Sequence, residues 1–127
     1  MVLLRIVVGV LLVAHGLVHL LYLAPGIPEF SLDGSWLLSG PARRPVAYVL
    51  MAATVIAFLV MTLAVWQVPG LDTAWPVLAL VGAGLSTALL VLFWNGRLVL
   101  GLVIDALLIA AAVLRPAWLE RFMVGGW

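Results

Sequence analysis

The sequence predicts an all-α integral membrane protein, a four-helix transmembrane bundle with a capping loop between its first and second helices. Hydrophobic residues make up 67% of the 127 positions and charged residues only 9%, whereas a soluble domain carries about 25% charged residues. Four apolar stretches approach the length of about 20 residues that a helix needs to cross a bilayer. All six tryptophans fall outside or at the ends of these stretches, which is typical of an interfacial aromatic belt. A chain of this length forms one domain, so we treat residues 1–127 as a single transmembrane domain.

The predicted spans are separated by residues that end helices. They cover about residues 3–23, 46–66, 75–94 and 98–114. The first ends before Pro25, and the fourth is stopped by Arg115 and Pro116. The third begins at Trp75 and Pro76, and proline suits the first turn of a helix.

The pair Asn95-Gly96 sets the relation between the last two spans. This pair favours a β-hairpin between alternating strands, but both flanks are continuous apolar runs, so we expect a tight helical hairpin. Four antiparallel spans place both termini on one membrane face, defined here as face A, and residues 24–45 on the opposite face B. The arginines divide equally between the two faces, and the amino terminus favours a cytoplasmic face A.

Three ionisable residues lie at hydrocarbon depth in the predicted spans: His15, His19 and Asp105. Such groups are costly in hydrocarbon, usually face the bundle interior and suggest a functional site. The two histidines share one helical stripe with Tyr22. With a rise of about 1.5 Å per residue, His15 lies roughly 12 Å and Asp105 roughly 10 Å below face B. Hydroxyl residues of the other two spans fall at the same level, so we predict a polar pocket toward face B with these candidate residues: His15, His19, Tyr22, Thr54, Ser86, Thr87 and Asp105.

Three interpretations of this polar layer stay open. The residues form a structural cluster, because hydrocarbon offers them no other hydrogen-bond partner. Alternatively, an imidazole binds a small amphipathic molecule such as a quinone. In the third interpretation His15 and His19 ligate a metal or haem, and Asp105 is a third ligand or orients one ring. A closed zinc site needs four ligands, and the absence of cysteine removes thiolate ligands and disulfides.

Residues outside the polar layer have mainly structural interpretations. Met51, Phe58 and Met61 form a stripe at helical spacing, which predicts core packing. Gly101 and the glycines of the third span allow close helix packing or leave room for a ligand, and packing is their ordinary role in membranes. Arg5 lies near face A, where we expect its guanidinium to reach lipid phosphates.

The segment of residues 24–45 is longer than the about 12 to 15 residues usual for a connection without structure of its own. Its centre, around Trp36, is apolar. This composition predicts either a lid over the polar layer or an interfacial anchor with the indole at headgroup level.

The first span also carries a pattern found in a known family. It reads LRIVVG from Leu4 and AHGLVHL from Ala14. This resembles the first helix of DoxX-like membrane proteins, which begin with an arginine at the membrane edge, a glycine soon after, and a glycine followed three residues later by lysine or histidine and then leucine. The positions that match are Arg5, Gly9, Gly16 and His19. The resemblance implies a four-helix bundle, and it implies a quinone or a partner subunit because the founding members are subunits of a quinone-linked sulfur-compound oxidoreductase.

We therefore expect a protein of a bacterial-type cytoplasmic membrane that binds a small hydrophobic ligand at its polar layer or acts as an accessory subunit. One alternative is a component of a membrane oxidoreductase linked to quinone, haem or metal. Another is a structural or assembly subunit that contacts a membrane partner or a second copy of the chain. A net charge of +1 with scattered arginines offers no basic stripe for a nucleic acid.

Overall fold

The computed structural model describes residues 2–20, 40–93 and 99–125. Within these ranges the regular elements are helices, which confirms the all-α prediction for this part of the chain. In chain order they are α1 (Val2–Val18), α2 (Gly40–Val65), α3 (Trp75–Leu92), α4 (Val99–Leu114) and α5 (Ala117–Val124).

The length and apolar character of these helices indicate a membrane protein. Segments Pro45–Val65 and Trp75–Leu92 are each long and apolar enough to cross a bilayer. Helices α4 and α5 meet the same requirement only as a pair that is bent by 94°, and α1 is apolar but has 17 residues. The described residues therefore contain two or three candidate spans.

The helices differ from the sequence prediction at three places. Helix α1 ends at Val18, whereas the first predicted span runs to about residue 23. Helix α2 begins at Gly40 rather than near Val46, so Pro45 lies inside it. Proline lacks the backbone N–H that would bond to the preceding turn, and this made Pro45 a natural boundary in the sequence. Helix α5 was not predicted; it follows Pro116, which adopts an extended conformation at the helix cap. Residues 21–39 of the predicted capping loop lie outside the described residues.

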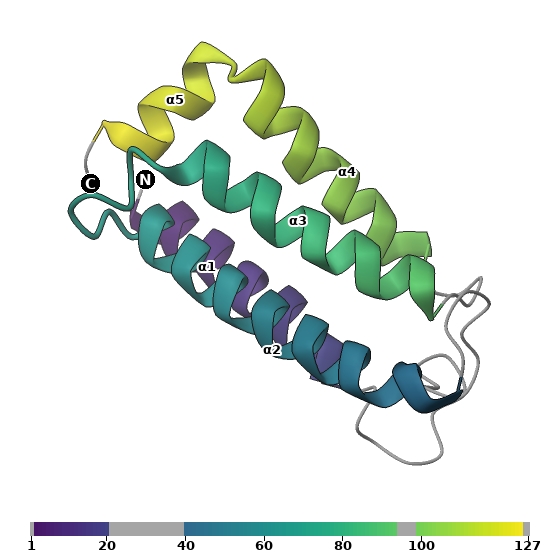
Figure 1. Cartoon of the computed structure of the whole chain (residues 1–127). Helices are drawn as coiled ribbons and strands as arrows, with labels where there is room; N and C mark the ends of the chain where they lie inside the picture. Colours follow the sequence, from purple (N-terminus) through teal and green to yellow (C-terminus); the bar gives the residue numbers. More distant parts are fainter. Residues whose placement is uncertain (1, 21–39, 94–98, 126–127) are drawn as a thin grey trace.

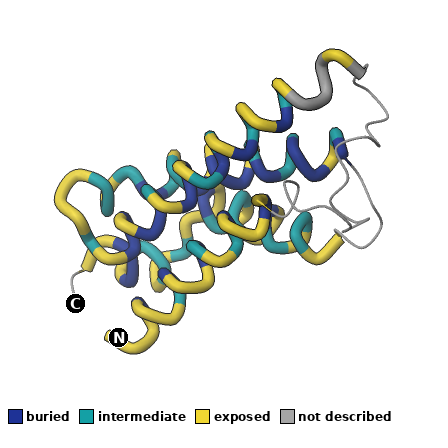
Figure 2. Tube along the Cα trace, turned by 90° about the horizontal axis from the view of Figure 1, so that it is seen from below, coloured by how far each residue is buried: buried dark blue, intermediate teal, exposed yellow. Residues whose placement is uncertain are grey.

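Helices α1 to α4 pack in chain order, α1 against α2, α2 against α3, and α3 against α4. Helix α5 folds back from the end of α4, so that the start of α1 and the end of α5 lie at the same end of the molecule (Figure 1). Buried residues line the inward faces of the helices, and the outward faces are exposed (Figure 2). Several exposed positions are large and apolar, such as Leu3 and Leu114 at 74% and 76% exposure.

Two apolar clusters form the core, and polar residues separate them. One cluster contains Phe58, Met61 and Trp75, and the other contains Met51 and Leu89. Met51, Phe58 and Met61 are all buried, which confirms the predicted core stripe. Thr54 of α2 lies in sequence between Met51 and Phe58 and is itself fully buried, so the buried polar level lies where one apolar cluster gives way to the other.

Glycines bring neighbouring helices into close contact. A Cβ atom added at Gly16 would lie 2.7 Å from Phe58 Cβ, and one added at Gly9 would collide with the Trp66 indole. A Cβ atom at Gly101 would lie 2.9 Å from Leu90 Cδ1. Gly101 therefore packs closely against Leu90, and it also lines a cavity between α1 and α4.

The prediction that Arg5 reaches lipid phosphates was wrong, because its side chain is fully buried. The guanidinium donates to the carbonyl oxygen of Val65 at 2.8 Å and to that of Phe122. Its central carbon also lies 4.6 Å from the centre of the Phe122 ring. The carbonyl of Val65 ends α2 and lacks a partner within that helix. Arg5 satisfies it and joins α1, α2 and α5, an arrangement that depends on the bend before α5.

Candidate functional site

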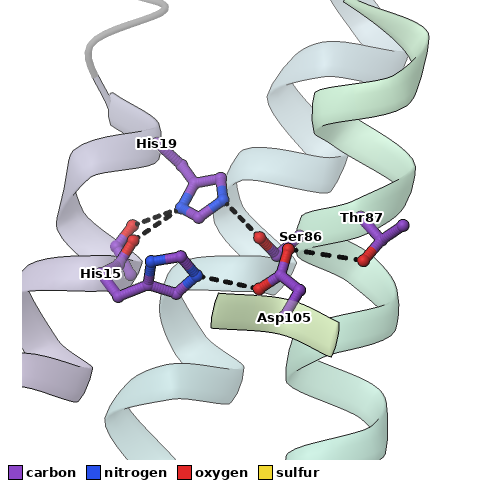
Figure 3. Close-up of polar contacts among 6 residues, drawn as sticks. His15, His19, Ser86, Thr87 and Asp105 are labelled. Atoms are coloured by element: carbon purple, nitrogen blue, oxygen red, sulfur yellow. Dashed lines mark hydrogen bonds and ion pairs between the residues drawn. The ribbon is translucent and has the colours of Figure 1, made fainter. Parts of the chain in front are cut away.

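A hydrogen bond between His15 of α1 and Asp105 of α4 is the centre of the candidate site (Figure 3). His15 Nε2 lies 2.9 Å from Asp105 Oδ1, and the side chains are 9% and 1% exposed. Asp105 Oδ2 also accepts a hydrogen bond from Thr87 Oγ1 of α3, at 3.4 Å. A carboxylate oxygen accepts hydrogen bonds, so His15 Nε2 carries a hydrogen and donates it.

His19 is fully occupied by hydrogen bonds to its neighbours. Its Nδ1 lies 2.8 Å from the carbonyl oxygen of His15 and 3.2 Å from that of Gly16. Carbonyl oxygens only accept, so this nitrogen carries a hydrogen, and in the neutral ring Nε2 accepts from Ser86 Oγ at 2.7 Å. His19 therefore fixes the end of α1 to α3 and has no ring nitrogen left for a ligand.

The second ring nitrogen of His15 differs from those of His19. Among the described residues, no side chain or backbone group forms a hydrogen bond with His15 Nδ1, and the residue lines a cavity. When Nε2 donates to Asp105, the neutral ring leaves a lone pair on Nδ1. His15 thus offers one hydrogen-bond acceptor whose ring orientation is set by Asp105.

Phe58 supports both imidazoles from α2. Its ring centre lies 4.9 Å from that of His15 in an edge-to-face arrangement and 6.4 Å from that of His19 in a stacked one. The sequence pattern predicted Phe58 in the core, but it did not predict the contact of Phe58 with both imidazoles. Side chains tilt toward the start of their own helix, so Phe58 tilts toward the end of the molecule where α2 begins and α1 ends. This tilt brings it to the level of the histidines.

The structure brings some of the predicted site residues together and leaves others outside the network. The structure brings together His15, His19, Ser86, Thr87 and Asp105. Thr54 is fully buried, but its hydroxyl has no hydrogen-bond partner among the described residues, so it does not join this network. Tyr22 lies outside the described residues.

A cavity of about 520 Å³ lies between α1 and α4. Its lining runs along α1 from Val8 to His19 and along α4 from Leu100 to Ile104, with Leu90 of α3. Except for the two histidines the lining side chains are apolar. The sequence predicted a pocket toward face B, and the described lining instead extends along the gap between two helices.

The described residues do not supply a set of metal ligands. No group of three or more His, Cys, Asp or Glu side chains among them is placed to hold a metal ion. His15 Nε2 is engaged with Asp105, and both nitrogens of His19 are hydrogen-bonded. A metal or haem bound through both histidines would have to break the bond to Ser86.

Comparison with known proteins found no matching family model, no matching curated protein and no matching solved structure. What the protein does must then be inferred from the chemistry of the site. The His15–Asp105 pair in an apolar cavity can accept a hydrogen bond, and Asp105 can stabilise the imidazolium if a proton follows.

Proposed function

We propose that this chain is a multi-pass protein in which α1 to α4 form a four-helix transmembrane bundle, and that it binds a small hydrophobic ligand with a hydroxyl group between α1 and α4. Leu3 and Leu11 on the outer face of α1 are 74% and 63% exposed, which supports a place for α1 in lipid. The resemblance of the first helix to DoxX-like proteins agrees with four crossings. Both termini then lie on one side, and α5 lies at the membrane surface.

The observation that carries the ligand proposal is the single acceptor that an apolar cavity offers at His15 Nδ1. Water competes weakly in such surroundings, so a hydrogen bond formed there is stronger than one at an exposed site. A ligand hydroxyl that donates to Nδ1 gives the imidazole nitrogen a donor and gives the hydroxyl hydrogen an acceptor. A ketone or ether of the same size only accepts hydrogen bonds and gains nothing from this nitrogen.

The second candidate function is that of a component of a quinone-linked membrane oxidoreductase. The contact between His15 and Asp105 favours this function. Asp105 would stabilise a protonated His15. His15 could then accept the proton that a quinol hydroxyl releases when a partner subunit removes the electrons. This function requires preferential binding of the quinol, because the oxygens of the quinone only accept hydrogen bonds.

Binding of 1-octanol and of its methyl ether tests the proposed function. We expect the protein in lipid nanodiscs to prefer the alcohol by about tenfold, the effect of one hydrogen bond in a protected site. The double variant His15→Leu/Asp105→Leu, which leaves no unpaired buried charge, should lose this preference. Thr87→Val is the matched control, because it changes the Asp105 contact but keeps His15.

A second measurement protects this test against a variant that fails to fold. In wild-type protein labelled with ¹⁵N-histidine, 1-octanol should shift the NMR signal of His15 Nδ1 and leave the signals of His19 in place. Equal binding of alcohol and ether, with no shift at His15, would show that the proposed function is wrong. Loss of stability in the double variant as its sole effect would favour the structural role of the cluster.

A further inference from the structure

We propose that the ligand is a long-chain alcohol lipid, whose hydroxyl group donates to His15 and whose single hydrocarbon chain fills a second cavity beside α5. This inference rests on the proposed function of His15 and adds the chemical class of the ligand. It has three independent supports in the structure: the two cavities share lining residues, α5 forms a wall of the second one, and the described lining of the first one contains no arginine.

The two cavities lie next to each other along α1 and share two lining residues. The second has a volume of about 620 Å³ and shares Val8 and Leu12 with the first. Its other lining residues come from all five helices and include no ionisable side chain. From His15 to Leu4, the lining residue nearest the start of α1, the helix rises about 16 Å. One narrow molecule with a polar end and a long apolar tail matches this shape and this distribution of polarity.

Helix α5 forms part of the wall of the second cavity. The bend of 94° between α4 and α5 places Trp118, Leu119 and Phe122 in the lining. Arg5 holds this wall in place through its contacts with the carbonyl and the ring of Phe122. We infer that this wall limits the length of the bound chain, which bulk lipid does not.

The charges at the polar end favour a neutral head group. The described lining of the first cavity includes no arginine, so no described residue there offers a fixed positive charge to a phosphate head group. A fatty acid would bring a carboxylate close to Asp105, and like charges in a buried site repel each other. A hydroxyl group is neutral and can donate a hydrogen bond to His15 Nδ1.

Chain-length selection tests the inference. Nanodiscs containing the protein are equilibrated with an equimolar mixture of primary alcohols from octanol to eicosanol, and the alcohols retained by the protein are quantified by gas chromatography. We expect the protein to retain most strongly an alcohol of intermediate chain length, about fivefold more than octanol. A chain that reaches α5 replaces a void with packing contacts. The fatty acid of the optimal length should bind more weakly than the alcohol.

Variants of α4 and α5 locate the chain. Ala111 lines the second cavity, so Ala111→Phe should shift the optimum to shorter alcohols and reduce the binding of long alcohols more than that of octanol. Leu119→Trp fills the same cavity from α5 and provides a second test if the first variant does not fold. Ala110 is the exposed neighbour on α4, and Ala110→Phe should keep the wild-type optimum.

The outcomes separate this inference from the proposed function. If the alcohols show no optimum and Ala111→Phe changes nothing, but octanol still requires His15, the chain inference is wrong and the proposed function stands. If the fatty acid or the parent alkane binds as well as the alcohol, the assignment of the head group is wrong. If the binding of octanol does not depend on His15, both proposals fail.

Discussion

At the scale of single residues, His15 and His19 show how two similar side chains acquire different roles. The helical rise predicted His15 at the depth of Asp105 and His19 about one turn nearer to face B. Both histidines have polar partners because polar groups in hydrocarbon must find one another. Spacing along the helix could not decide which histidine meets Asp105. The choice depends on the rotation of α1 against α3 and α4, and it leaves a ring nitrogen free of hydrogen bonds to described residues at His15 alone.

The environment of Arg5 could not be predicted from the sequence. Its acceptor at Phe122 lies near the carboxyl end of the chain and is reached only because α5 folds back. Position near a membrane face usually favours contact with phosphates. In this protein the carbonyl groups at the end of α2 and on α5 supply acceptors within the fold.

Replacement of Arg5 tests its role as a link between three helices. We expect Arg5→Met to lower the free energy of unfolding by about 2 kcal/mol, because hydrogen bonds to a charged donor are lost and buried carbonyls are left unsatisfied. Arg5→Lys should give an intermediate loss, since an ammonium group lacks the planar fork that reaches two acceptors. Thermal unfolding in detergent measures both. Arg121 is exposed on α5, and if Arg121→Met proved as harmful as Arg5→Met, burial of Arg5 would not explain the loss.

At the scale of helices, the start of α3 and the end of α4 were predicted, whereas the end of α1 and the start of α2 were not. Trp75-Pro76 and Arg115-Pro116 mark the start of α3 and the stop after α4, because proline restricts backbone geometry locally. Helix α5 was missed since it has only eight residues. Its signals were present, with Pro116 at the cap, Glu120 in the first turn and Arg121 in the last, an order that suits the helix dipole.

The contact of α1 with α2 makes a prediction at this scale. Gly16→Ala should lower the free energy of unfolding by about 1 to 3 kcal/mol, because the new methyl group overlaps with Phe58 and forces the helices apart. It should also weaken the preference for octanol over its ether, since Phe58 supports the His15 ring. Gly84 has open space at the same test position, so Gly84→Ala is the matched control and should change stability by no more than about 0.5 kcal/mol. Similar losses in both variants would contradict a specific α1–α2 contact.

At the scale of the whole molecule, the gap between α1 and α4 gives the fold its proposed function. Main packing runs from α1 through α2 and α3 to α4, and the His15–Asp105 pair is a polar contact across the gap. In water such a gap between apolar helices would collapse or be covered, because exposed apolar surface is unfavourable. In a bilayer the lipid chains are as apolar as the helices, so the gap persists and can admit a lipid from the side. The surrounding medium therefore determines whether this arrangement is a packing defect or a binding site.

The proposed crossings can be tested because the natural chain has no cysteine. Thr73 between α2 and α3 and Val124 at the end of α5 are exposed, as is Pro41 near the start of α2. If α1 to α4 all cross the membrane, Thr73→Cys and Val124→Cys should react with a membrane-impermeant maleimide from one side, and Pro41→Cys should react from the other. The arginines divide equally between the two faces, and the amino terminus favours the cytoplasm for the first pair. Inside-out vesicles should therefore label that pair, and right-side-out vesicles should label Pro41→Cys. Labelling of Val124→Cys from the side of Pro41→Cys would mean that α4 does not cross. Protection of Val124→Cys from both sides would mean that α4 and α5 form one broken span, and the cavity beneath α5 would then lie within the membrane at both ends.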